Sequence, residues 1–131
     1  MKLKVLPLAA IAAIAFVAPA LAHHSFAMFD ADKTVTLDGI VAEFEWSNPH
    51  SWIRVNVADQ SGRPLQWAIE MNAPAQLTQR GWNPTIIKPG DKITLTIHPL
   101  RDGARGGQFI DAKLAGGQTL SNGPNNFRPR N

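Results

Sequence analysis

Residues 51–81 decide the fold of this chain, and they read SWIRVNVADQSGRPLQWAIEMNAPAQLTQRG. Apolar and polar side chains alternate along residues 51–58 and again along residues 64–71, which is the period of a strand with one buried face. Between them, Asp59–Gly62 has the composition of a short hairpin loop. The apolar positions are Ile53, Val55, Val57, Leu65, Trp67, Ile69 and Met71. The stretch therefore predicts two antiparallel strands that share one buried face.

The period changes after Met71. Asn72 suits the N-cap of a helix, Pro74 suits its first turn, and Gly81 suits the position just after its last turn. We therefore predict a short helix over residues 75–80, about two turns long.

Strand patterns also lie on both sides of this stretch. Residues 34–46 predict one long strand in which Val35 and Leu37 occupy one parity, while Ile40, Ala42, Phe44 and Trp46 occupy the other. The switch at Asp38–Gly39 indicates a glycine β-bulge. Residues 84–87 are expected to be extended, and residues 93–98 and 108–114 alternate as strands.

The order of these elements predicts the fold class. Three strands, one helix and two strands match the five-stranded Greek-key barrel called the OB-fold, whose strands carry a ligand-binding face. We therefore predict an all-β, small OB-like barrel with one short helix between strands 3 and 4. An open meander or a small immunoglobulin-like sandwich is the alternative, although sandwiches usually have about seven strands. Trp46, Trp67 and Trp82 are expected in the core, and Trp52 on the outer face.

The first 22 residues have the anatomy of a cleavable secretory signal peptide. Lys2 and Lys4 precede an apolar run, and Ala20–Ala22 forms a small-x-small cleavage site. No later stretch approaches the roughly 20 apolar residues of a membrane span, so we expect no transmembrane anchor. We expect a periplasmic or secreted protein, cut after Ala22. Its predicted parts are a signal peptide at 1–22, an N-terminal arm at 23–33, the barrel at 34–118 and a disordered tail at 119–131.

Composition narrows the classes of function. The chain has no cysteine, which excludes disulfides and thiolate metal sites. Cleavage removes Lys2 and Lys4, so the formal net charge falls from +3 to +1. Nucleic-acid binding would need basic residues around exposed aromatics, and only Arg54 accompanies Trp52. We therefore expect no nucleic-acid partner.

Four histidines remain after cleavage: His23, His24, His50 and His98. Imidazole and amine nitrogens suit Cu(II), Ni(II) or Zn(II), and cleavage after Ala22 would add the α-amine of His23. In the predicted barrel, His50 follows strand one and His98 ends strand four, beside two loops that flank the usual ligand face. These four residues are our candidate metal site, with Cu(II) as the favoured ion. The alternative is that each histidine is structural and caps a turn or ends a strand.

The arm presents a difficulty for this interpretation. The start of strand one is expected at the opposite end of the barrel from the two loops. About ten residues, roughly 30 Å at full stretch, would have to fold back for His23 to join the other ligands.

A second candidate site is an outer face that carries Trp52, Arg54, Glu70 and, in the following loop, Arg101. It would bind a small organic or saccharide ligand, or dock this chain as an accessory subunit on a larger exported enzyme. Glu43 and Glu45 lie on the outer parity of strand one and are expected to be solvated. No nucleophile–base pair or closed metal triad is visible, so we do not expect an enzyme.

Short motifs along nearly the whole mature chain resemble a family of small, uncharacterised proteins exported by Gram-negative bacteria. The more specific motifs are Asn48–His50 and His98–Gly103, which reads HPLRDG. The other motifs are Ala22–Phe26, Phe29–Asp30, Leu37–Gly39, Glu45–Trp46, Trp52, Trp67–Glu70, Gly81–Trp82 and Lys88–Asp91. The resemblance implies export and a single small β-domain. It implies no activity and no catalytic residues, but it makes the histidine-bearing motifs part of a shared pattern.

Overall fold

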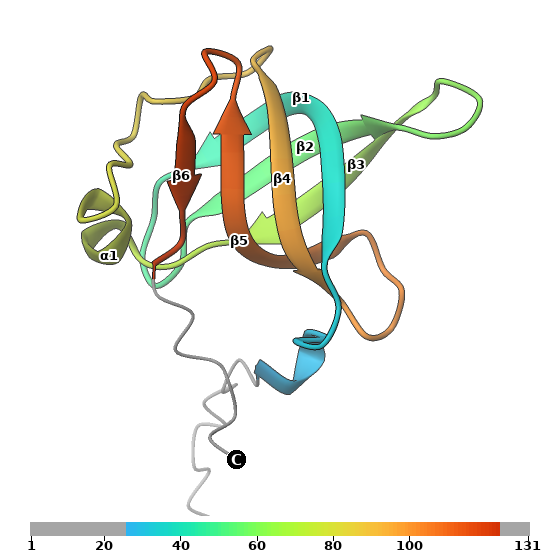
Figure 1. Cartoon of the computed structure of the whole chain (residues 1–131), viewed down its shortest axis with the longest axis horizontal. Helices are drawn as coiled ribbons and strands as arrows, with labels where there is room; N and C mark the ends of the chain where they lie inside the picture. The colour runs from blue at the N-terminus through green and yellow to red at the C-terminus, as the bar shows by residue number, and fades with distance from the viewer. Residues whose placement is uncertain (1–25, 124–131) are drawn as a thin grey trace, which may run out of the picture.

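The computed structural model describes residues 26–123, which form one β-barrel with a short helix at its side (Figure 1). The chain begins with a single 3-10 turn, η1. Six strands and one α-helix follow. In chain order the elements are η1 (Phe26–Met28), β1 (Val35–Glu45), β2 (Trp52–Ala58), β3 (Pro64–Glu70), α1 (Pro74–Thr78), β4 (Lys92–Pro99), β5 (Gly106–Leu114) and β6 (Thr119–Ser121).

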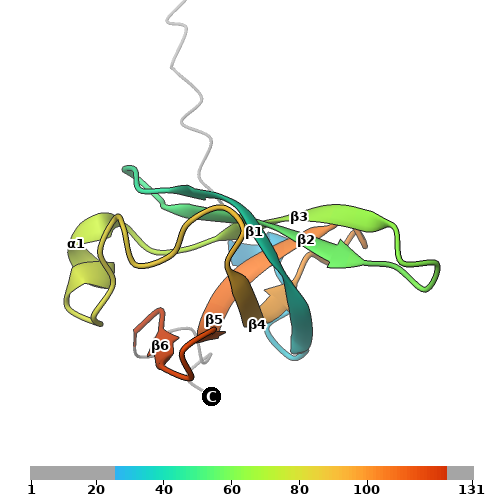
Figure 2. The ribbon, with the colours of Figure 1, turned by 90° about the horizontal axis from the view of Figure 1, so that it is seen from above.

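The barrel closes through β1 and through a parallel pair. The strand order is β3-β2-β1-β4-β5-β6, and β3 also pairs with β5, which joins the two sides of the sheet. The long strand β1 pairs with β4 over its first half and with β2 over its second half. Seen from above, β1 therefore bends across the molecule (Figure 2). The predicted OB-like barrel with its helix between strands 3 and 4 is confirmed.

Alternation along the strands fills the barrel with apolar side chains. Ile53, Val55, Leu95 and Ile97 are completely buried. Leu77 of α1 is also completely buried and joins the same core, so the helix covers one side of the barrel. The four tryptophans follow the predicted division. Trp82 is fully buried, Trp46 and Trp67 pack half-buried against the core, and Trp52 lies half-buried on the outer face.

The predicted bulge at Asp38–Gly39 is wrong in its position. The register of β1 against β2 shifts between Val41 and Glu43, and Ile40 is 39% exposed rather than buried. Gly39 has a different reason to be glycine. A Cβ atom there would lie 2.5 Å from the main-chain oxygen of Asn56, which lies on the neighbouring strand β2 and pairs with the next residue, Ile40.

The connection between β3 and β4 differs in detail from the prediction. The N-cap is Ala73, one residue after the predicted Asn72, whose main-chain N–H and side-chain amide donate to Asn122 instead. The helix starts at Pro74, one residue before the predicted range. The helix ends at Thr78 with Gln79 as its C-cap, two residues before the predicted end, and Gly81 follows in the next turn with a φ of 90°. Residues 84–87 form turns and bends rather than an extended segment, with the Ile86 N–H donating to the Asn83 carbonyl at 3.2 Å.

The folded domain extends beyond the predicted boundary at residue 118. A tight turn, closed by the Leu114 N–H donating to the Gln118 carbonyl, leads into β6, which pairs with β5. Leu120 is buried against the core, and Asn122 is buried beside Asn72. The assignment of residues 119–123 to a disordered tail is therefore wrong.

Some predicted parts lie outside the described residues. They are the signal peptide, His23, His24 and residues 124–131. Between residues 26 and 123, no helix has the length and apolar character needed to cross a membrane.

Candidate functional site

The start of the described chain lies across the β4–β5 loop. We call residues 27–30, which make these contacts, the N-terminal strap. Phe29 is buried and forms a β-bridge with Leu100, and the Asp30 N–H donates to the Pro99 carbonyl at 2.8 Å. The expectation that strand one starts at the far end of the barrel is therefore wrong. In Figure 1, η1 and the β4–β5 loop lie together at the lower end of the barrel. The first strand pairs with the end of β4, which explains this placement.

Arg101 holds this strap in place. Its Nε donates to the Ala27 carbonyl at 3.0 Å, and its Nη1 lies 3.7 Å from Oδ1 of Asp30. The Lys33 ammonium, 3.1 Å from Asp30 Oδ2, hydrogen-bonds to that carboxylate and lowers its pKa below the usual 3.8; burial opposes this effect, and the charge of Arg101 adds to it. Arg101 was predicted as a ligand-binding residue, and in the structure it anchors the N-terminal segment.

His98 is oriented by the same segment. Its Nδ1 lies 2.8 Å from the carbonyl oxygen of Lys33. A carbonyl only accepts, so Nδ1 carries the hydrogen and donates. In the neutral ring, Nε2 then keeps its lone pair.

Cross-strand pairing places four side chains in one row on the outside of the barrel. Trp52 pairs with Glu70, Glu70 with Gln108, and Gln108 with His98. Directly paired residues point to the same face of a sheet. The predicted neighbours Trp52 and Glu70 therefore do share a face with His98. Neighbouring strands are about 4.8 Å apart, so Gln108 separates Glu70 from His98 by roughly 10 Å between Cα atoms.

His50 meets Glu70 at the end of this row. The His50 Nδ1 donates to the Met71 carbonyl at 3.0 Å, and its Nε2 lies 3.5 Å from Oε1 of Glu70. The side chain of Glu70 is only 7% exposed. Among the described residues, the ion-pair partner of this carboxylate is His50, which carries the positive charge when its ring is protonated.

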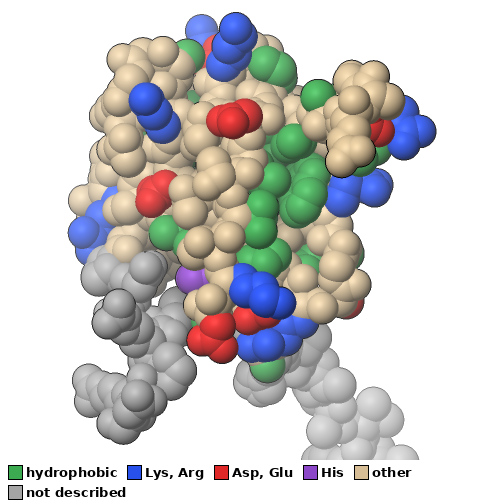
Figure 3. Space-filling model, turned by 45° about the vertical axis from the view of Figure 1, so that its right-hand side comes forward, with side chains coloured by type: hydrophobic (Ala, Val, Ile, Leu, Met, Phe, Trp, Pro, Cys, Tyr) green, Lys and Arg blue, Asp and Glu red, His purple; other side chains and the backbone are tan. Residues whose placement is uncertain are grey.

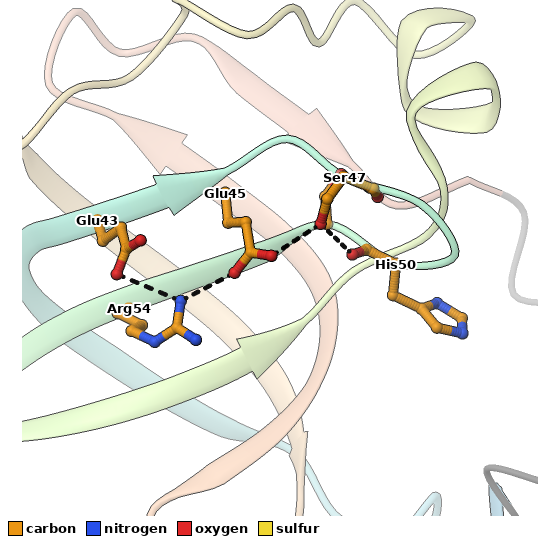
Figure 4. A network of polar contacts seen from close by, with 6 residues as sticks. Glu43, Glu45, Ser47, His50 and Arg54 are labelled. Atoms are coloured by element: carbon orange, nitrogen blue, oxygen red, sulfur yellow. Dashed lines mark hydrogen bonds and ion pairs between the residues drawn. The ribbon is translucent and has the colours of Figure 1, made fainter. Parts of the chain in front are cut away.

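The loop that carries His50 is held by a polar chain on the outer face (Figure 4). Arg54 Nη1 lies 3.4 Å from Glu43 Oε2 and 3.2 Å from Glu45 Oε2. Ser47 Oγ lies 3.0 Å from Glu45 Oε1 and 3.0 Å from the His50 carbonyl oxygen, so these two acceptors share its single hydroxyl hydrogen. Arg54 is thus engaged by two carboxylates, which were expected to be merely solvated. Figure 4 shows the imidazole of His50 pointing away from this chain.

The structure brings some of the predicted site residues together and keeps others apart. His50 and Glu70 are in contact, Trp52 and His98 lie in the same row, and Arg54 and Arg101 are engaged elsewhere. No three histidine or acidic side chains of residues 26–123 come together in a group that could hold a metal ion. The predicted ligands His23 and His24 fall before the described part of the chain.

Three contributors to this site were not predicted. Gln108 fills the row, the Met71 carbonyl orients His50, and Ser47 ties the loop to Glu45. Only Ser47 carried a sequence signal, because Ser47–Pro49 has the composition of a turn. The other two depend on pairings between distant parts of the chain.

A groove of the described surface lies away from these histidines. It has a volume of about 800 Å³ and is formed where β4 begins and β5 ends, with Ile40, Pro64, Lys92 and Lys113 among its lining residues. Figure 3 shows a further apolar strip on one side of the molecule, with acidic and basic side chains mixed at its lower end. No histidine lines this groove.

Comparison with known proteins identifies the family to which this chain belongs. No curated protein is similar enough in sequence to match this chain. Among solved structures, the crystal structure of the mitochondrial single-stranded DNA binding protein Rim1 from S. cerevisiae is similar at 12% identity, with a TM-score of 0.46. The similarity covers 63% of this chain and 94% of that chain. Residues 10–109 match DUF6152, a family of unknown function, and the chain belongs to that family.

Proposed function

We propose that this chain is an exported, non-enzymatic binding protein that holds a transition-metal ion such as Cu(II) through its histidines. The observation that supports this most is the orientation of His50. A main-chain carbonyl holds its Nδ1, and its Nε2 faces the buried carboxylate of Glu70. Metal-binding histidines usually donate their second ring nitrogen to a carbonyl or carboxylate in this way, which fixes the ring and exposes the other nitrogen.

The N-terminal segment supports a contribution from His23. Residues 27–30 are fastened to the β4–β5 loop, at the barrel end where His98 also lies. His23 precedes Ala27 by four residues, which is roughly 14 Å at full stretch. His23 would therefore be within reach of this barrel end. Cleavage after Ala22 would give His23 a free α-amine as a further ligand.

A second candidate is a site for a small organic or saccharide ligand, or for a larger exported enzyme, on the outer row. It is favoured by Trp52, a half-buried aromatic beside Glu70 on the outer face. It is weakened by Arg54 and Arg101, whose guanidinium groups already contact carboxylates of the barrel and the strap.

Calorimetric titration with Cu(II) tests the proposed function. The mature protein starting at His23 should bind Cu(II) saturably, and an extra residue before His23 should weaken binding because it removes the α-amine. His50→Ala and His98→Ala should each weaken binding if all the sites converge. Ligand nitrogens must be deprotonated, so binding should also weaken as the pH falls below neutrality.

The outcomes separate the candidates. If only the extra residue matters, the arm binds copper alone and the barrel histidines are structural. If the correctly cleaved protein shows no saturable binding, the metal function is wrong and the Trp52 face becomes the better candidate. Mass spectrometry of the protein exported without an affinity tag would give its true N-terminus and any retained metal.

A further inference from the structure

We propose that the groove where β4 begins and β5 ends binds an aliphatic carboxylate. Lys92 and Lys113 hold its anionic head, and apolar side chains of the groove hold its chain. This site goes beyond the proposed metal function and lies away from the histidines. Lys92 and His98 are six residues apart on β4, which separates them by roughly 20 Å along the strand.

The first argument is the size and the lining of the groove. Its volume of about 800 Å³ lies within the range of about 300–1,000 Å³ that small-molecule sites occupy. Ala58 and Pro64 contribute to the lining where they pair with each other, and from there the β2–β3 hairpin extends beyond the barrel (Figure 1). Ile40 of β1 and Leu114 of β5 add further apolar surface. A mainly apolar lining with a few polar groups is typical of sites for small organic molecules.

The second argument is the exposure of Ile40. Between residues 26 and 123, the large hydrophobic residues with high exposure are Met28 and Ile40. Ile40 pairs with Asn56 on β2 and with Lys92 on β4, so the three side chains share the outer face of the sheet. A single exposed isoleucine is ordinary. This one lies in a groove beside other apolar side chains, where an aliphatic chain would cover it and remove its surface from water.

The third argument is the placement of the two lysines. Lys113 pairs with Thr94, which lies two residues after Lys92, so the lysines are diagonal neighbours on the outer face. Diagonal neighbours are roughly 7–8 Å apart, within reach of long side chains. Both lysines are exposed, and neither forms an ion pair with an acidic side chain of the described residues. Their flexible ammonium groups can therefore converge on one anion, which also relieves their mutual repulsion.

Asp38 reduces the positive charge of the groove without cancelling it. It pairs with Thr94, whose hydroxyl donates to Asp38 Oδ1 at 2.6 Å. The charged lining residues are two lysines and one aspartate, so two positive charges and one negative charge leave a net charge of +1. This charge matches a singly charged carboxylate better than a phosphate monoester, which carries about −1.5 to −2 at neutral pH.

Titration of the isotope-labelled mature protein with octanoate, followed by NMR spectroscopy, tests the proposal. The amide signals of Ile40, Lys92 and Lys113 should shift saturably. Lys92→Gln and Lys113→Gln should each weaken octanoate binding by about threefold or more, because each removes one charge that attracts the head. Lys88→Gln is the matched control and should leave the affinity unchanged, since Lys88 is an exposed lysine outside the groove.

Two further variants test the other parts of the site. Ile40→Thr keeps a β-branched side chain on the strand but removes apolar surface, so it should weaken octanoate binding. Asp38→Asn removes the negative charge of the groove and should strengthen binding; weaker binding would overturn the charge argument. Thermal unfolding should give melting temperatures close to that of the wild type, because both positions are exposed.

Three further compounds separate the head from the chain. Acetate has only the head and octanol has only a neutral chain, so both should bind more weakly than octanoate. Equal binding of octanol would overturn the role of the lysines, and equal binding of acetate would overturn the role of the apolar lining. Tighter binding of octyl phosphate would contradict the carboxylate head. Absence of saturable shifts at the groove would overturn the whole proposal and would leave metal binding by the histidines untouched.

Discussion

At the scale of single residues, the structure assigns roles by contact rather than by residue type. Arg54 and Arg101 have the chemistry of ligand-binding residues, but each guanidinium contacts carboxylates of the fold. Glu70 has the chemistry of a surface residue, but it is buried against His50. The alternation in the sequence predicted which face of a strand such side chains occupy. It could not predict their contact partners, because these can be far away in the chain, as Arg101 and Ala27 are at 74 residues apart.

Gly39 gives a prediction at this scale. Gly39→Ala should destabilise the protein by roughly 1–3 kcal/mol, because the added Cβ would overlap the Asn56 carbonyl oxygen and the Val55 side chain. Urea unfolding measures the effect. Gly116→Ala is the control, since a Cβ there meets nothing within 4 Å. Equal, small effects at both positions would show that Asn56 does not approach Gly39 as closely as described.

At the scale of elements, alternation predicted most of the barrel. β2 and β3 have one apolar residue in two, so their faces could be assigned directly from the sequence. β6 escaped prediction because three residues are too few to show a period, and it is a strand only through its pairing with β5. The position of the bulge, at Val41–Glu43, was not predicted correctly. A glycine in a strand indicates either a bulge or a close approach of a neighbouring backbone, and at Gly39 it is the second.

The N-terminal strap gives a prediction with a defined pH dependence. The folded state lowers the pKa of Asp30 below 3.8, so its ion pairs stabilise the fold above that pH and are lost as the pH falls through the lowered value. Asp30→Asn should therefore lower the melting temperature at neutral pH, and this difference from wild type should shrink as the pH falls from about 5 to about 2.

Circular dichroism melts at several pH values measure this dependence. Asp32→Asn, at an exposed position two residues away, is the control and should show little difference at any pH. A difference between Asp30→Asn and wild type that stays constant down to the lowest pH would contradict the role given to the Asp30 ion pairs.

At the scale of the whole molecule, the folded unit ends later than the sequence pattern suggested. Leu120 is buried, the Trp82 Nε1 donates to the Ser121 carbonyl at 3.1 Å, and Asn122 bonds Asn72. These contacts join the last strand to the connection before β4. The residues after β5 therefore belong to the domain that positions the end of β3.

Truncation tests this boundary. A chain ending at Gln118 should lose about 3 kcal/mol or more of unfolding free energy, since a buried leucine and several hydrogen bonds are removed. A chain ending at Gly123 keeps all of these contacts and serves as the control. If the two truncated chains unfold at the same urea concentration, β6 adds nothing to the domain.

The central claim is that the protein holds a transition-metal ion through its histidines, with His50 oriented by the Met71 carbonyl. The most direct measurement is anomalous X-ray diffraction from crystals of the mature protein grown with Zn(II). The account predicts an anomalous peak within about 2.0–2.2 Å of His50 Nε2. A metal-loaded crystal in which Zn(II) lies only at residues other than the histidines would contradict it.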